Sequence, residues 1–284
     1  MIDSITNSAR TSTSLLLHTA AIALALALAA AAATPVCAQE RPAPLRALES
    51  QGVTVVGTFP APGGLTAWAA YTGRQPVALY ATPDGNHVVA GSMLDADGKN
   101  LTREALDKAV RGPMSAAMWK QAEASHWIGD GQAKAPRTVY VFTDPNCPYC
   151  NKFWADARPW VDSGKVVLRH IMVGILTPTS AGKAAALLAD KNPSAALAAH
   201  ERGHSAENAK TLATGRPKPL GDSGVKPLAQ IPAAVQAKLD ANEKLMADWG
   251  LQATPAVVWR DAAGIVQMRT GAPEGALVEV LGAR

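Results

Sequence analysis

The chain has 284 residues, of which 48% are hydrophobic and 18% are charged, and its formal net charge is +4. This length is sufficient to bury one or two ordinary cores, so two domains are a reasonable expectation. The net positive charge is too small to indicate a protein that binds nucleic acid.

The N-terminal residues predict a secretory signal. A Leu/Ala-rich run at 14–33 follows a short head containing Arg10, and the small residues of Val36-Cys37-Ala38 predict cleavage after Ala38. A membrane anchor is the main alternative, because about 20 apolar residues can cross a bilayer, but the alanine richness and the cleavage-like end argue against it. Lipid attachment at Cys37 is less favoured, because Thr34-Pro35-Val36 does not form a lipobox. Residues 1–38 are therefore predicted to be removed on export.

Residues 39–100 predict a small antiparallel sheet. A short helix at 44–51, ended by Gly52, precedes the sheet. Proline and glycine at 61–64 and 82–86 supply the turns between strands. The β-prone runs occupy residues 53–59, 65–71, 77–81 and 87–93. Four strands in this length make a thin core, which is typical of a module that relies on a partner surface.

Residues 101–130 predict a connecting helix. Thr102 is a possible N-cap, and Gly112-Pro113 is expected to break or kink the helix. The cluster of Met114, Met118 and Trp119 is interpreted as packing rather than as a binding patch. Gly129-Asp130-Gly131 closes the segment, which places a domain boundary near residue 130.

Residues 131–284 alternate strands and helices. The expected order is a strand at 138–143, a helix at 148–161, a strand at 165–173, a helical stretch at 179–203, a polar loop to 228, a helix at 232–249, two short strands and a final helix. This order predicts an α+β protein whose C-terminal domain has a thioredoxin-like fold with a helical insertion at about 178–249.

The sequence Cys147-Pro148-Tyr149-Cys150 lies between the predicted strand and helix. A thiolate at a helix N-terminus is stabilised by unpaired backbone N–H groups and by the helix dipole, so the pKa of Cys147 should fall. Pro148 is compatible with the first helical turn. Cys147 is therefore predicted to attack a disulfide or a sulfenic acid, and Cys150, which should be more buried, to resolve the mixed disulfide.

Two other readings of this cysteine pair are less favoured. A structural zinc site commonly needs four ligands, and the chain has three cysteines in total, so no second cysteine pair is available. A structural disulfide across so small a loop would add little stability. We therefore expect redox chemistry with no metal and no cofactor.

Several weaker signals accompany the dithiol. Thr254-Pro255 precedes an apolar strand, and on sequence alone a cis peptide bond there is uncommon. Asp144 could tune the dithiol, but a turn through Asp144-Pro145-Asn146 explains it equally well. Scattered histidines are more often surface or capping residues, so no role is assigned to those at 126, 170, 200 and 204.

The chain resembles the DsbC/DsbG family of periplasmic thiol:disulfide interchange proteins. The resemblance rests on 143–150, 157–166 and 240–246 and extends to 61–64, 82–85 and 125–127, while 205–228 fits least well. It implies a V-shaped homodimer formed through the N-terminal domain at 39–100, a linker helix at 101–130 and a catalytic domain at 131–284. It also implies that Thr254 and Pro255 form a cis-proline loop beside the dithiol, and that Val141 replaces the buried aspartate of thioredoxin, leaving no internal base at that position.

The resemblance further implies a membrane reductase of the DsbD type as a partner, and exported proteins with disulfides or oxidised cysteines as substrates. The predicted function is that of a disulfide reductase or isomerase that also reduces sulfenylated single cysteines. The alternatives are a holdase chaperone with incidental redox activity and a dithiol oxidase that donates disulfides.

Overall fold

The computed structural model describes residues 41–284. The predicted signal segment, its cleavage site and Cys37 lie outside the described residues. Among the residues that are described, no helix combines the length and the apolar character needed to cross a membrane.

The first sheet is antiparallel, with strand order β1-β2-β3-β4. It follows helix α2 (Ala43–Ser50) and contains β1 (Thr54–Phe59), β2 (Thr66–Thr72), β3 (Gln75–Ala81) and β4 (Val88–Ala90). One face packs on Leu45 of α2, and the other face packs on Leu106 and Val110 of the next helix. Gly85, with φ of +69°, makes the turn between β3 and β4.

Helix α3 (Arg103–Ala124) contains Pro113 in its interior, so the expected break at Gly112-Pro113 does not occur. The residues on both sides of the proline pack on other elements, because Val110 lies against the first sheet and Met118 lies in the core of the second sheet. This packing offsets the intrahelical hydrogen bond that Pro113, which has no N–H, cannot form. Thr102 is not a side-chain cap. Its hydroxyl instead accepts a hydrogen bond from the Met93 N–H, and the Asn100 carboxamide caps the helix by accepting from Arg103 N.

The second sheet has strand order β5-β7-β6-β8-β9, with β6 and β7 parallel and the other pairs antiparallel. Its strands are β5 (Trp127–Asp130), β6 (Arg137–Thr143), β7 (Val166–Met172), β8 (Ala256–Arg260) and β9 (Val266–Thr270). The edge strand β5 was not expected from the sequence, because its glycine suggested a turn. Pairing with β7 decides its conformation.

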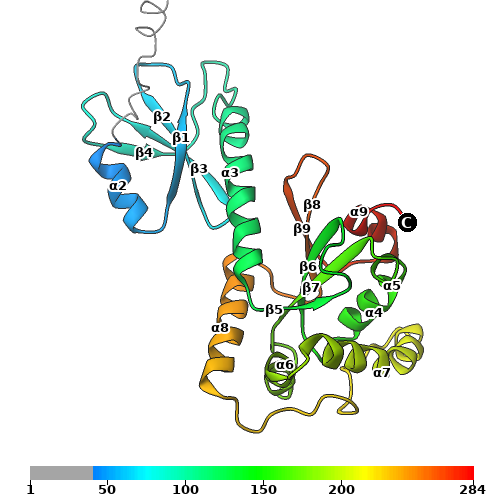
Figure 1. Cartoon of the computed structure of the whole chain (residues 1–284). Helices are drawn as coiled ribbons and strands as arrows, with labels where there is room; N and C mark the ends of the chain where they lie inside the picture. The colour runs from blue at the N-terminus through cyan, green and yellow to red at the C-terminus, as the bar shows by residue number, and fades with distance from the viewer. Residues whose placement is uncertain (1–40) are drawn as a thin grey trace, which may run out of the picture. The chain divides into compact units, whose positions relative to one another are not determined.

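The helices around this sheet are α4 (Pro148–Asp156), α5 (Arg158–Val161), α6 (Ser180–Ala189), α7 (Pro193–Ala213), α8 (Ala233–Asp248), the 3-10 turn η1 (Glu274–Ala276) and α9 (Leu277–Leu281). The single helix expected at 148–161 is therefore two helices. Helix α7 continues ten residues beyond the predicted end at 203 and lies alongside α4 (Figure 1). The α+β class and the thioredoxin-like C-terminal fold are confirmed, whereas the exact domain boundaries remain predictions.

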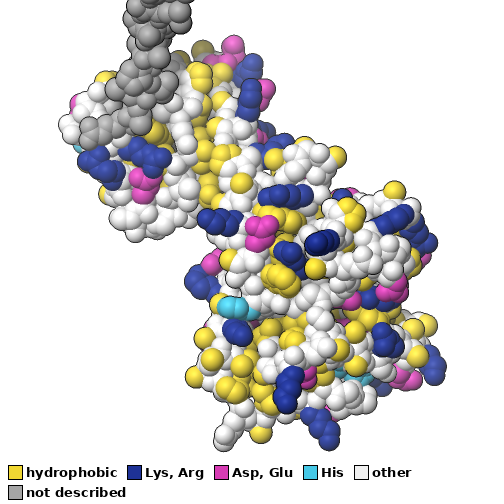
Figure 2. Space-filling model, viewed as in Figure 1, with side chains coloured by type: hydrophobic (Ala, Val, Ile, Leu, Met, Phe, Trp, Pro, Cys, Tyr) yellow, Lys and Arg dark blue, Asp and Glu magenta, His cyan; other side chains and the backbone are white. Residues whose placement is uncertain are grey.

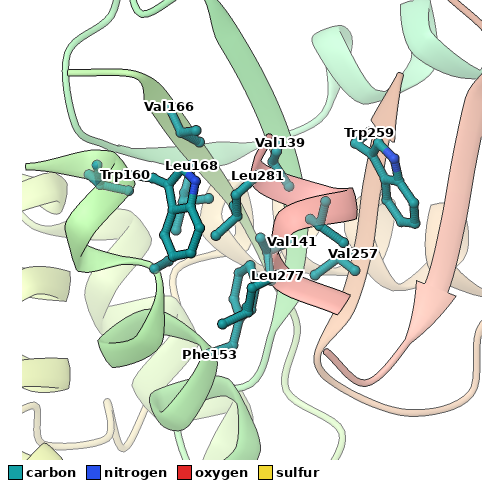
Figure 3. Close-up of a cluster of buried hydrophobic side chains, with 13 residues drawn as sticks. Val139, Val141, Phe153, Trp160, Val166, Leu168, Val257, Trp259, Leu277 and Leu281 are labelled. Carbon is teal, nitrogen blue, oxygen red and sulfur yellow. The ribbon is translucent and has the colours of Figure 1, made fainter. Parts of the chain in front are cut away.

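Side chains of β6 alternate between two cores, as the period of a strand requires. Val139 and Val141 face a cluster with Phe153 and Trp160, which Figure 3 shows together with Leu277 and Leu281 of α9. Tyr140 and Phe142 face the opposite cluster, which contains Met118 and Trp119 of α3. The interpretation of these α3 residues as packing is confirmed. The central strand that leads to Cys147 is therefore held from both faces.

Candidate functional site

Cys147 is the N-cap of α4, directly after the loop that follows β6. Its sulfur accepts a hydrogen bond from the Cys150 backbone N–H at 3.2 Å. The hydrogen bond with the Cys150 thiol lowers the pKa of Cys147 against the opposing effect of burial, and contacts with Thr254 and with backbone N–H groups lower it further. The predicted direction of the pKa shift therefore agrees with the geometry of the helix N-terminus.

Cys150 lies one turn into α4. Burial raises the pKa of Cys150 well above the ordinary thiol value, and the negative charge of Cys147 raises it further. Both cysteines are 2% exposed, so the expected difference in exposure is not seen. Instead, the two sulfurs differ in their electrostatic surroundings, which favour the thiolate at Cys147 and the thiol at Cys150.

Thr254 and Pro255 approach the dithiol from the other side, where they precede β8. Their peptide bond is cis. The Cys147 thiol lies 3.4 Å from the Thr254 carbonyl oxygen, to which it donates a hydrogen bond. Antiparallel pairing of β8 with β6 brings this loop, more than a hundred residues away in sequence, to the start of α4.

A groove of about 510 Å³ opens beside the cysteine pair. It is lined by Tyr149, Lys152, Thr254, Pro255 and residues 270–274. Tyr149 is 51% exposed, whereas its neighbours Pro148 and Cys150 are buried. An extended chain lying in this groove would therefore contact the exposed tyrosine and the cis-proline loop together.

The loop before Cys147 is fixed by buried polar side chains, of which the sequence indicated Asp144 but not Lys183. Asp144 is fully buried and accepts hydrogen bonds from the backbone N–H groups of Asn146, Ile175 and Leu176. Lys183 of α6 is also fully buried and donates to the Asn146 carboxamide oxygen at 2.7 Å. Asp144 thus organises the turn before Cys147, which is one of the two roles expected for it.

Helix α7 holds the first turn of α4 through amide side chains. Asn208 donates to the Pro148 carbonyl at 2.7 Å and to the Asn151 side-chain oxygen at 3.0 Å. Asn151 in turn donates to Glu201. Sequence reasoning missed this contact, although the spacing of Glu201, Ser205 and Asn208 is that of one helix face.

Among the histidines at 126, 170, 200 and 204, which were expected to be surface or capping residues, the last three are buried, so the surface interpretation is wrong for them. His200 contacts the Pro145 carbonyl oxygen at 2.7 Å, and His170 contacts the Thr143 hydroxyl at 2.8 Å. His204 packs against His200. All three support the segment that carries Cys147, directly or through a neighbour, whereas His126 is exposed.

Within residues 41–284, no group of three or more His, Cys, Asp or Glu side chains is arranged to hold a metal ion. On the face drawn in Figure 2, Lys and Arg side chains are dispersed among acidic and neutral ones.

Comparison with known proteins agrees with this geometry. Residues 130–282 match the model of a thioredoxin-like domain, and residues 29–103 match that of the disulfide bond isomerase protein N-terminal domain. The thiol:disulfide interchange protein DsbG of Pseudomonas aeruginosa is 50% identical over 248 residues, which cover 87% of this chain and 91% of the relative. This chain belongs to the DsbG family. The DsbG protein of Escherichia coli is 39% identical over 86% of this chain and 92% of its own length. The activity of the chain is accordingly thiol:disulfide interchange.

Proposed function

We propose that Cys147 is the attacking thiolate and Cys150 the resolving thiol of this interchange. The observation that carries the proposal is the position of the Cys147 sulfur, which caps α4 and also contacts the carbonyl of Thr254 beside a peptide-sized groove. Pro148 and Tyr149 shape the turn and its exposed surface. Thr254 and Pro255 position the client backbone next to the attacking sulfur.

The exchange proceeds in two balanced steps. The Cys147 thiolate attacks a client disulfide, forming a mixed disulfide and releasing a client thiolate. The Cys150 thiol then loses its proton and attacks the Cys147 sulfur, which closes the internal disulfide and releases the second client sulfur as a thiolate. The high pKa of Cys150 keeps it protonated beside the Cys147 thiolate. Formation of the mixed disulfide removes that negative charge and so favours deprotonation of Cys150.

The same pair can reduce a sulfenylated single cysteine. Attack of the Cys147 thiolate on the sulfenic sulfur expels hydroxide and forms a mixed disulfide, which Cys150 resolves as before. The expelled hydroxide takes up the proton that Cys150 loses, so the net products are a client thiolate, water and the internal disulfide. We propose both reactions for exported proteins, with disulfide reduction or isomerisation as the first.

We propose that the protein works in the periplasm as a homodimer joined through residues 39–100. The match to the N-terminal domain of disulfide bond isomerase proteins supports this assembly. Exposed apolar side chains support it too, because Val89 of edge strand β4 and Leu94 beyond it are 62% and 57% exposed. A membrane reductase of the DsbD type would return the cysteine pair to the dithiol form.

Trapping of mixed disulfides tests the proposal. Cys150→Ala is expressed in an exporting host, thiols are blocked with acid and alkylator, and the proteins held covalently are identified. We expect reducible adducts, and the double variant Cys147→Ser/Cys150→Ala is the matched control that should hold none. Partners with one cysteine would indicate rescue of sulfenylated proteins, and partners with several would indicate isomerisation.

Two results would favour the alternatives. An exported and folded Cys150→Ala variant without adducts, together with retained suppression of client aggregation by Cys147→Ser, would indicate a holdase. A wild-type pair found oxidised in the cell would indicate a dithiol oxidase.

A further inference from the structure

Helix α7 places one carboxyl group next to the dithiol turn. Glu201 is 1% exposed. Its carboxylate oxygen Oε2 and its backbone carbonyl both accept hydrogen bonds of 2.7 Å from the side-chain amide of Asn151, the residue that follows Cys150. Among residues 41–284, no lysine, arginine or histidine forms an ion pair with Glu201. A buried carboxyl with a neutral partner and no counter-ion is costly to ionise.

The charged surroundings of Glu201 couple it to the redox pair. Burial raises the pKa of Glu201 to about 8 against the effect of the Asn151 amide, and the negative charge of Cys147 raises it further. Asp130 acts in the same direction, and Arg158 acts in the opposite one. The elements around Glu201 also carry other titratable and charged groups. They are Cys147, Tyr149, Cys150, Lys152 and Asp156 at α4, Asp130 on β5, Arg158 on α5, Lys183 on α6, and His200, Arg202, His204, Glu207 and Lys210 on α7 itself.

Solvent can reach the neighbourhood of this carboxyl without passing the client groove. A second groove of about 380 Å³ lies between α4 and α7 and is lined by Asn151, Ser205 and Asn208, among others. Two of these residues contact Glu201, because Asn151 donates to its carboxylate and Ser205 donates to its backbone carbonyl. The Glu201 carboxyl is thus separated from this groove by the Asn151 side chain.

The position six residues before Cys147 offers no such group. Val141 is fully buried in an apolar cluster with Phe153 and Val257. Position 141 of β6 thus carries no acid, whereas α7 carries the buried carboxyl of Glu201.

On the basis of the roles proposed for Cys147 and Cys150, we propose that Glu201 holds a proton during the redox reaction. Its carboxyl is protonated while Cys147 is a thiolate, and it releases that proton when the Cys147–Cys150 disulfide forms. Closing the disulfide transfers two electrons to the client and removes the proton of Cys150 and the negative charge of Cys147. The carboxyl then ionises as the neighbouring negative charge disappears, and its proton passes to water. Glu201 is a positioning residue in this scheme, since it acts through Asn151 and through its charge and does not touch the client.

The test compares the oxidation equilibrium of the full-length wild type, Glu201→Gln and Glu207→Gln in glutathione buffers from pH 5 to 9. Glutamine preserves an oxygen that can accept from Asn151, and Glu207 is an exposed carboxylate on the same helix. Each additional proton released changes an equilibrium constant about tenfold per pH unit. We expect the ratio of the wild-type constant to the Glu201→Gln constant to rise with pH, by up to about tenfold per unit, and to level off above pH 8. The ratio of wild type to Glu207→Gln should stay constant.

A ratio for Glu201→Gln that is constant across this range would overturn the inference. The second measurement needs no variant: the carboxyl resonance of Glu201 is titrated by NMR in the reduced and in the oxidised wild type. A higher midpoint in the reduced protein supports the inference even if Glu201→Gln does not fold, and equal midpoints overturn it. If the wild type exchanges normally with glutathione but the ratio of the wild-type to the Glu201→Gln constant does not change with pH, only the role of Glu201 is rejected. A wild type that forms no Cys147–Cys150 disulfide would reject the proposed function and this inference together.

Discussion

Replacing Lys183 with methionine tests how strongly the insertion holds the active-site loop. The lysine is fully buried on α6, and its ammonium donates to the Asn146 carboxamide at 2.7 Å and to the Gly221 carbonyl at 2.8 Å. It also pairs at 2.9 Å with Asp222, whose side chain is 70% exposed. Methionine preserves most of the apolar stem but donates no hydrogen bond.

The expected loss of stability follows from these contacts. The buried Asn146 oxygen left without a donor costs about 1–3 kcal/mol, whereas the carbonyl of the exposed Gly221 can bond to water instead. The ion pair contributes at most about 1 kcal/mol, because Asp222 is exposed. The substitution also removes the cost of burying an ammonium group, which offsets part of the loss. We expect Lys183→Met to lower the free energy of unfolding by about 2–3 kcal/mol.

Urea unfolding followed by tryptophan fluorescence measures this change, with Asp222→Asn as the matched control. The control removes only the exposed partner and should cost less than about 1 kcal/mol. Hydrogen exchange at the Leu220 amide supplies a local readout, because that N–H donates to the Asn146 carbonyl at 2.9 Å. The reasoning is refuted if Lys183→Met is no less stable than the control or if the Leu220 amide exchanges at the wild-type rate.

Three further predictions concern the thiol, a buried histidine and the contact between α7 and α4. The pKa of Cys147 is lowered, so in the reduced protein its alkylation by iodoacetamide should reach half the maximal rate below the pH at which an ordinary thiol titrates. A midpoint at or above that pH would contradict the role of Cys147 as the attacking thiolate. Burial lowers the pKa of His200 to about 4 from 6.5. Between pH 6.5 and 4, His200 is therefore protonated in the unfolded chain but neutral in the folded protein. The stability of the fold consequently falls as the pH decreases across this range. In urea unfolding across this range, wild type should lose up to about 3 kcal/mol more than His200→Gln, and equal losses would exclude the effect. Asn208→Ala should cost about 2 kcal/mol in the same assay, because the Pro148 carbonyl loses its donor, whereas the exposed Lys210→Ala should be neutral; similar values for both would show that the contact contributes little.

Local signals in the sequence predicted most of the elements and the position of the cysteine pair between a strand and a helix. A short apolar run identified β6, and the proline after Cys147 indicated the start of α4. Predictions failed where packing overrides a local signal. Gly112-Pro113 does not break α3, which leaves the kink as a prediction, and β5 forms despite its glycine because β7 supplies hydrogen-bond partners.

The missed site residues share one property. Glu201, Asn208 and Lys183 are polar side chains on helices, which in isolation indicate a solvated face. They are buried because α6 and α7 lie over the loop and the helix that carry the cysteines. Only their partners, which are 37 to 60 residues away along the chain, distinguish them from surface residues.

The sequence by itself determined the chemistry, since a Cys-Pro-Tyr-Cys motif between a strand and a helix defines a dithiol whose first sulfur caps that helix. The tertiary structure decided what surrounds the dithiol. Strand pairing brings Thr254 to the Cys147 sulfur, and helix packing brings Glu201 to Asn151 beside Cys150. The physical reason is that a helix N-terminus is a local feature of the chain, whereas burial and the resulting pKa shifts depend on groups that only the completed fold brings together.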